Sequence, residues 1–249
     1  MTVIQACVDR SVATGPVLRA AASLARLFGA TVEAVHVPEG EVAAPLADAE
    51  VAGVPLRLQE GDVVGVLVRL GARPDVEAVA VGARSRVTSG TIGHVTRALA
   101  TTVDRPVLVV PPEAEVPDRF GRVLVAMKGT PTNAIRLQQA IQLAVDADLE
   151  VVAVHVDDES TIPSFSDQVQ HETDAYASEF LSRYAPGTTL ASFEPRIGVP
   201  AEEILAVADA VRPDAIAVGR RVDDPRGLGT VLRRLLERSH VPVLVVATD

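Results

Sequence analysis

The chain has 249 residues, of which 48% are hydrophobic and 22% are charged, a balance that is typical of folded globular proteins and excludes a disordered chain. A formal net charge of -10 and an aromatic content of 3% argue against partners such as nucleic acid or anionic membrane, which need a basic surface or base-stacking aromatics. The start resembles no signal peptide and no run of about 18 apolar residues occurs, so we expect a cytoplasmic protein without a membrane partner.

Four segments of the first half return in the same order in the second half. VIQACVDR (3–10), TVEAVHV (31–37), RPDVEAVAVG (73–82) and RPVLVVP (105–111) correspond to VLVAMKGT (123–130), EVVAVHV (150–156), RPDAIAVG (212–219) and VPVLVVA (241–247). Chance is a poor explanation for four matches in order, and the chain is therefore read as a duplication.

The duplication divides the chain into two domains of unequal length. The first domain is predicted to span residues 1–111 and the second residues 120–249. The Pro-rich, acidic stretch 112–119 between them has the composition of a linker. The first copy is shorter between its second and third strands, where residues 38–53 stand opposite 157–187. We expect it to have lost most of one helix there.

The periodicity of the second copy predicts an alternation of strands and helices. Strands are expected near 122–127, 150–156, 188–194, 214–218 and 242–247, and helices near 132–146, 164–184, 200–211 and 229–239. Nearly continuous Val, Ala and Ile runs that alternate with helices indicate a parallel sheet covered on both faces. Each half is thus predicted to be a doubly wound α/β domain.

The repeated segments, taken together, resemble the universal stress protein family. The resemblance rests on the strand ending VDRS, the AVHV strand, GVPAEEIL (198–205), RPDAIAVG and the closing PVLVV, and it covers nearly the whole chain as two tandem domains. It implies a Rossmann-like, five-stranded parallel sheet of order 3-2-1-4-5 in each domain, with the domains related by pseudo-two-fold symmetry and paired through their last strands. It also implies a role in stress response.

The last strand of each half has independent reasons to pair. PVLVV is apolar on both faces, so it would be an exposed edge in an isolated domain and favours pairing with another edge. A tandem chain can satisfy both edges by intramolecular pairing, and a further homodimer stays open. Ligands bind open parallel sheets where the strand order reverses, which selects the loops after Val8 and Val81 and after Met127 and Val218.

In nucleotide-binding members of this family, an Asp after strand 1 and a Val after strand 2 hold the adenosine, and a G-x2-G-x9-G-[ST] loop holds the phosphates. The first half departs from this loop, since Ser85 replaces the second Gly and seven residues rather than nine separate it from Gly93. Gly90 could move the register, but only four residues would then intervene. Arg84 could contact an anion by its side chain. The first-half candidates are Asp9, Val37, Gly82, Arg84, Gly93 and His94.

The second half departs further from the same pattern. Lys128 stands where the Asp is expected, Val222 replaces the second Gly, and Asp223 and Asp224 would repel phosphate. Neighbouring arginines could instead bind an anion. The second-half candidates for a nucleotide or an anion are Lys128, Val156, Gly219, Arg220, Arg221, Gly229 and Thr230.

Three other residues receive structural interpretations. His36 and His155 share one repeat position, and neither has metal-ligand partners at suitable spacing, so both are predicted to be structural and no metal site is expected. No basic residue flanks Cys7 directly in the sequence, and it is expected to be a small buried strand residue.

Motifs of four enzyme classes are absent: G-x-G-x-x-G after strand 1, G-x-x-x-x-G-K-[ST], G-x-S-x-G and paired Cys ligands. We therefore expect a binding or regulatory module with degenerate nucleotide loops, no catalytic residues and no turnover. Two alternatives stay open. One is a weak ATP or AMP binder, or slow ATPase, that uses the first-half cleft, and the other is a binder of a small acidic metabolite at the arginines of the second-half loop.

Overall fold

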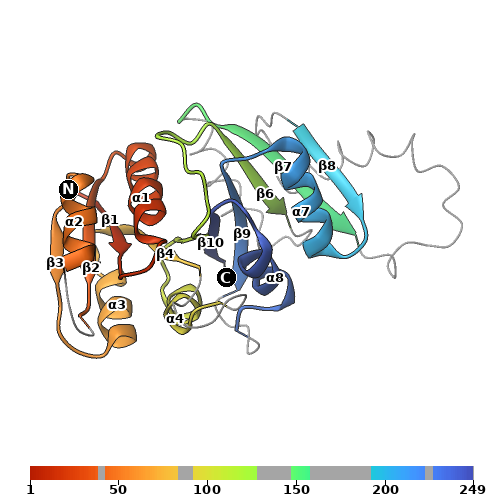
Figure 1. Cartoon of the computed structure of the whole chain (residues 1–249). Helices are drawn as coiled ribbons and strands as arrows, with labels where there is room; N and C mark the ends of the chain where they lie inside the picture. Colours follow the sequence, from red (N-terminus) through yellow and green to blue (C-terminus); the bar gives the residue numbers. More distant parts are fainter. Residues whose placement is uncertain (39–42, 84–91, 128–146, 158–191, 222–226, 249) are drawn as a thin grey trace, which may run out of the picture.

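The chain forms one continuous sheet of ten strands in the order β3-β2-β1-β4-β5-β10-β9-β6-β7-β8 (Figure 1). The computed structural model describes residues 1–38, 43–83, 92–127, 147–157, 192–221 and 227–248. Each half has the predicted strand order 3-2-1-4-5, and within each half all strand pairs are parallel. The prediction of two doubly wound α/β units is therefore confirmed.

The described residues of the first half form nine elements. They are β1 (Val3–Cys7), α1 (Thr14–Phe28), β2 (Thr31–His36), α2 (Ala43–Val51), β3 (Leu56–Leu58), α3 (Val63–Gly71), β4 (Val76–Gly82), α4 (His94–Thr102) and β5 (Val107–Val110). Helix α2 has nine residues and occupies the stretch where most of a helix was expected to be lost. This helix is shorter than the segment 164–184 predicted as a helix in the second copy, which lies outside the described residues.

The described elements of the second half follow the predicted alternation. They are β6 (Arg122–Met127), β7 (Glu150–Asp157), β8 (Ser192–Ile197), α7 (Pro200–Val211), β9 (Ala215–Arg221), α8 (Thr230–Arg238) and β10 (Val243–Thr248). Helix α7 begins at Pro200, whose fixed φ suits the first turn, and carries Glu202 and Glu203 at its positive end. The predicted helices 132–146 and 164–184 lie outside the described residues.

The two halves join through their last strands, as predicted. Strands β5 and β10 pair antiparallel with Val243 opposite Val109, Leu244 opposite Leu108 and Val245 opposite Val107. This pairing gives each strand a neighbour on the side that would be a free edge in a separate domain. The intramolecular pairing of the two halves therefore converts two five-stranded sheets into one.

Two apolar layers cover the two faces of this sheet. Side chains alternate along a strand, so Val107 and Val109 pack in one layer, while Leu108 and Val110 pack in the other. Residues of α3, α4, α7 and α8 belong to the first layer. Residues of α1 and of the connection between β5 and β6 belong to the second. Each layer includes strands of both halves, so the halves share a common core.

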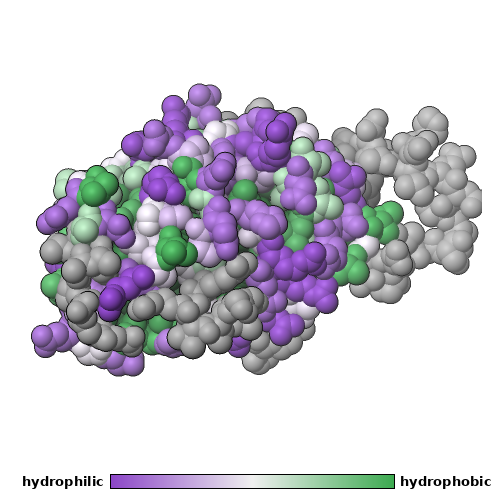
Figure 2. All heavy atoms as spheres, in the orientation of Figure 1, coloured by the Kyte–Doolittle hydropathy of each residue, from purple (hydrophilic) through white to green (hydrophobic). Residues whose placement is uncertain are grey.

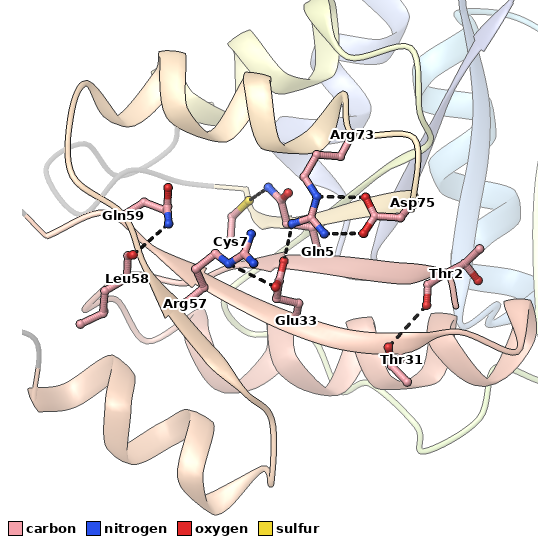
Figure 3. Close-up of polar contacts among 10 residues, drawn as sticks. All are labelled: Thr2, Gln5, Cys7, Thr31, Glu33, Arg57, Leu58, Gln59, Arg73 and Asp75. Carbon is pink, nitrogen blue, oxygen red and sulfur yellow. Dashed lines mark hydrogen bonds and ion pairs between the residues drawn. The ribbon is translucent and has the colours of Figure 1, made fainter.

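An ion-pair cluster ties strands β2 and β3 to the segment just before β4 (Figure 3). Arg73, just before β4, donates from Nη1 to Glu33 Oε2 at 2.8 Å and from Nε to Asp75 Oδ1 at 3.0 Å. Arg57 of β3 lies 3.3 Å from the other oxygen of Glu33. The hydrogen bond from Arg73 holds the pKa of the Asp75 carboxyl below its ordinary value. Because Arg73 and Asp75 lie at the amino end of β4, the cluster leaves the opposite strand ends open.

The surface is mainly hydrophilic on the face drawn in Figure 2, where hydrophobic residues lie as separate spots among polar ones. Single exposed apolar residues such as Val12 and Val51 are ordinary on a protein surface. Among the helices in the described part of the chain, none combines the length and the apolar character needed to cross a membrane.

Candidate functional site

A cavity of about 460 Å³ lies at the carboxyl ends of β1 and β4, where the strand order of the first half reverses. Five of the six residues predicted for this half line it: Asp9, Val37, Gly82, Gly93 and His94. The sixth, Arg84, lies outside the described residues. The structure thus brings together side chains and backbone from four separate segments, as the parallel topology requires.

Asp9 is held in a defined position at the cavity by the turn that follows β1. Its Oδ1 accepts a hydrogen bond from the Ser11 backbone N–H at 2.8 Å, and its carbonyl accepts one from Thr14 Oγ1 at 2.7 Å. An Asp that bonds the backbone two residues on is typical of a tight turn. The carboxylate is exposed and can therefore accept further hydrogen bonds from a ligand.

Gly82 has a packing role that is distinct from phosphate binding. A Cβ at this position would lie 3.0 Å from the Cβ of Ala13, so any side chain would push α1 away from β4. Its carbonyl accepts a hydrogen bond from Thr96 Oγ1 at 2.6 Å. Thr96 of α4 and Thr14 of α1 thus tie the two helices to the two strand ends that border the cavity.

Gly93 is buried, and its backbone N–H donates to the Ala83 carbonyl at 3.1 Å. The resemblance implies that a glycine amide here would contact a phosphate, but this amide already has a partner. His94 follows as the first residue of α4 and is exposed. A helix N-terminus favours negative charge. Because the Gly93 amide is already occupied, His94 and the start of α4 are the groups in the described part of this cavity that suit an anion.

One wall of the cavity is apolar and contains Val17, Leu67 and Val81. Cys7 also lies there, and burial raises the pKa of its thiol to about 12. A thiol with such a pKa is neutral at physiological pH and a poor nucleophile. The structural interpretation of Cys7 agrees with this environment.

His36 also lines the cavity, although sequence reasoning assigned it a structural role alone. Its side chain is buried, and its Nδ1 lies 2.9 Å from the carbonyl oxygen of Val8. The repeat held a signal that the two histidines differ in their surroundings: Asp157 follows the second AVHV segment, whereas Pro38 follows the first. Within the described parts of the chain, no group of three or more His, Cys, Asp and Glu side chains is arranged to hold a metal ion.

The second-half candidates Arg220 and Arg221 are strand residues, which corrects their prediction as loop residues. Strand β9 continues two positions past Gly219 because Arg220 and Arg221 pair with Ala247 and Thr248 at the end of β10. The Arg220 side chain is only 5% exposed, and its Nη2 donates to the Val103 carbonyl of the first half at 3.2 Å. Burial lowers the pKa of Arg220. Arg220 therefore belongs to the junction between the halves.

The other described candidates of the second half lie in β7, at Gly219 of β9 and at the start of α8. Val156 is half-buried in β7, Gly229 precedes α8 with a φ of 65°, and Thr230 begins that helix. A left-handed φ of this kind favours glycine, so Gly229 is explained by the turn into α8. Lys128 and residues 222–226 lie outside the described residues.

Comparisons with known proteins agree with this architecture. A model of the universal stress protein family matches residues 119–247, more than half of the chain. The solved structure of a universal stress protein from Archaeoglobus fulgidus is similar with a TM-score of 0.67 and 17% identity, covering 98% of each chain. That of a putative universal stress protein from Pseudomonas aeruginosa is similar with a TM-score of 0.71 and 15% identity, covering 100% of this chain and 94% of that one. The curated proteins contain no significant match.

Proposed function

The chain belongs to the universal stress protein family, and we propose that it is a regulatory binding module whose first-half cavity holds the nucleoside part of an adenine nucleotide without turning it over. One observation carries this proposal: Asp9, Val37, Gly82, Gly93 and His94, which the family pattern selects from four distant segments, line a single cavity. Stress response is the setting that family membership supports.

The dimensions and lining of the cavity support a nucleoside. Its volume of about 460 Å³ lies in the usual range for small-molecule sites, which combine apolar walls with a few fixed polar groups. The apolar wall around Val17 and Leu67 suits a planar base, and the fixed Asp9 carboxylate can accept hydrogen bonds from hydroxyl or amine groups. Adenosine and AMP present both kinds of surface.

The phosphate side of the site supports a short phosphate chain over a long one. The Gly93 amide is already bonded to Ala83, and the loop carries Ser85 where the family pattern has glycine. The first feature occupies a backbone N–H that could otherwise contact a phosphate, and the second adds a side chain where glycine would let the backbone approach an extended triphosphate closely. His94 at the start of α4 offers one place for a single phosphate. We therefore propose that AMP and adenosine bind better than ATP.

The absence of turnover is part of the proposal. The sequence lacks the phosphate-loop motif G-x-x-x-x-G-K-[ST] that positions a triphosphate for transfer. The alternative of a slow ATPase predicts release of inorganic phosphate from ATP at a rate that depends on Asp9. The alternative of an acidic metabolite at the second-half arginines loses support, because Arg220 is buried against Val103.

Isothermal titration calorimetry on protein freed of ligand by unfolding and refolding tests this function. We expect AMP and adenosine to bind with one site per chain and ATP to bind at least several-fold more weakly. Phosphate release from ATP, followed in parallel, should not exceed that of a buffer blank. Failure of all adenine compounds to bind would contradict the proposal, and phosphate release that Asp9→Ala abolishes would favour the ATPase.

A further inference from the structure

One ring nitrogen of His36 has no hydrogen-bond partner among the residues that the structure describes. Its Nδ1 lies 2.9 Å from the Val8 carbonyl oxygen. Since a carbonyl oxygen can only accept, Nδ1 must bear the hydrogen and donate it. In a neutral imidazole the other nitrogen, Nε2, is then an acceptor with a free lone pair.

This acceptor is buried and unsatisfied among the described residues. The His36 side chain is 5% exposed, and Nε2 has no hydrogen-bond partner within the described part of the chain. Buried polar atoms in native proteins nearly always have a partner, and each exception asks for an explanation. His36 lines the same cavity as Asp9 and Val37, so a ligand in that cavity can supply the missing donor.

The second half shows what the same histidine does when the protein supplies the partner. His155 occupies the equivalent position, and its Nδ1 lies 2.9 Å from the Met127 carbonyl oxygen, as in the first half. Its Nε2, however, lies 3.3 Å from Asp157 Oδ1. Pro38 takes the place of Asp157 in the first half, and its side chain offers no hydrogen-bonding group. The first copy thus keeps the histidine and the Nδ1 contact, but none of its described residues partners Nε2 as Asp157 does in the second copy.

We propose that Nε2 of His36 accepts a hydrogen bond from an uncharged N–H or O–H group of the ligand in the first-half cavity, and that His36 thereby selects ligands with a donor at that point. The inference rests on the proposed function, because it assumes that a nucleoside occupies this cavity. Two groups of adenosine have the required chemistry, the exocyclic amine of the base and the hydroxyls of the ribose. His36 is then a specificity-determining residue of this half alone.

The variant His36→Asn separates this role from a structural one. The amide nitrogen of Asn can reproduce the Nδ1 donor to the Val8 carbonyl, whereas Asn has no atom at the position of Nε2. His155→Asn is the matched control, because it makes the same change in the other half. Thermal unfolding verifies that both variants fold, and His36→Phe, which keeps the ring volume, serves as a second variant if His36→Asn does not.

Calorimetry with adenosine, purine riboside, 2′-deoxyadenosine and 3′-deoxyadenosine locates the contact. In the wild type, removal of the contacted donor should weaken binding roughly five- to tenfold, the usual effect of one hydrogen bond. In His36→Asn, adenosine should bind more weakly by a similar factor, and the same analogue should lose nothing further. His155→Asn should behave as the wild type. The base amine is identified if purine riboside is the affected analogue, and a ribose hydroxyl if a deoxy analogue is.

Two results would overturn the inference, and they are distinguishable. If the wild type binds adenosine and His36→Asn shows the same affinities across the series, the cavity is a nucleoside site but Nε2 does not contact the ligand. If the wild type binds no adenine compound, the proposed function fails and this inference fails with it.

Discussion

Leu108 and Leu244 face each other as a cross-strand pair at the point where the last strands of the two halves meet antiparallel. Leu108 is fully buried, in the layer that α1 covers, and Leu244 packs against the same layer from the second half. Because each layer of the core includes residues of both halves, the junction is part of the hydrophobic core. The two halves should therefore unfold as one cooperative unit.

Leu108→Ala should lower the free energy of unfolding by about 2 to 5 kcal/mol, since it opens a cavity in a packed core. Leu58→Ala on the outer strand β3 is the matched control, because Leu58 is 49% exposed, and it should cost about 0.5 kcal/mol or less. Urea unfolding followed by circular dichroism measures both. A single transition is expected in each case, and separate transitions for the two halves would argue against a shared core.

Gly82→Ala should destabilise the protein and weaken ligand binding together. The added Cβ would lie 3.0 Å from the Cβ of Ala13, so α1 must shift at the edge of the cavity, at a cost of about 1 to 3 kcal/mol. Gly15→Ala on α1 is the control, since its Cβ would meet only the end of Arg19 at 3.5 Å and should be neutral or slightly stabilising. Thermal unfolding and AMP titration of both variants test this; equal behaviour would show that α1 accommodates the methyl group.

Cys7 should make the protein less stable as the solution becomes alkaline. Burial raises the pKa of its thiol from 9.0 to about 12 in the folded state. Between these values the unfolded chain loses a proton that the folded chain keeps. Stability should then fall as pH rises above about 9, by up to about 1.4 kcal/mol per pH unit. Cys7→Ala should lack this component, so the stability difference between wild type and variant should shrink between pH 8.5 and 10.5. A constant difference would mean that the folded thiol titrates normally.

Arg220→Ala should destabilise the junction without affecting the ligand. The variant removes a buried side chain and its hydrogen bond to the Val103 carbonyl, and the expected loss is about 1 to 3 kcal/mol. Arg221→Ala, at the neighbouring exposed position, should change stability by about 0.5 kcal/mol or less. AMP affinity should be unchanged in both. A large loss of affinity in either variant would return the second-half arginines to the list of ligand contacts.

Much of the fold could be predicted from the sequence, because both copies of the repeat show the same alternation of apolar strands and helices. Strand β6 and helix α7 were predicted at their observed bounds, 122–127 and 200–211, since apolar periodicity and Pro200 mark them. The bounds of helix α2 could not be predicted, because the shorter first copy offers only a brief segment, AAPLADAEV, whose small residues give a weak helical period.

The residues of the candidate site could be predicted only where their position follows from the order of the strands. Asp9 and Val37 follow strands that parallel topology brings together, so their meeting at one cavity could be anticipated. The burial of Arg220 could not, because it depends on how far β9 continues along β10 and on contact with the other half. The lack of a partner for His36 Nε2 among the described residues likewise reflects a difference between the copies, Pro38 in the first and Asp157 in the second.

The most direct test of the first-half binding site is calorimetric titration of AMP into wild type, Asp9→Ala and Asp209→Ala. Asp9 lines the cavity, whereas Asp209 is an exposed residue of α7 in the other half, and both changes remove one carboxylate. We expect Asp9→Ala to weaken AMP binding about tenfold or more, as loss of a charged hydrogen-bond acceptor does, and Asp209→Ala to leave it unchanged. Equal affinity in all three proteins would contradict the account, because AMP would then bind elsewhere on the chain.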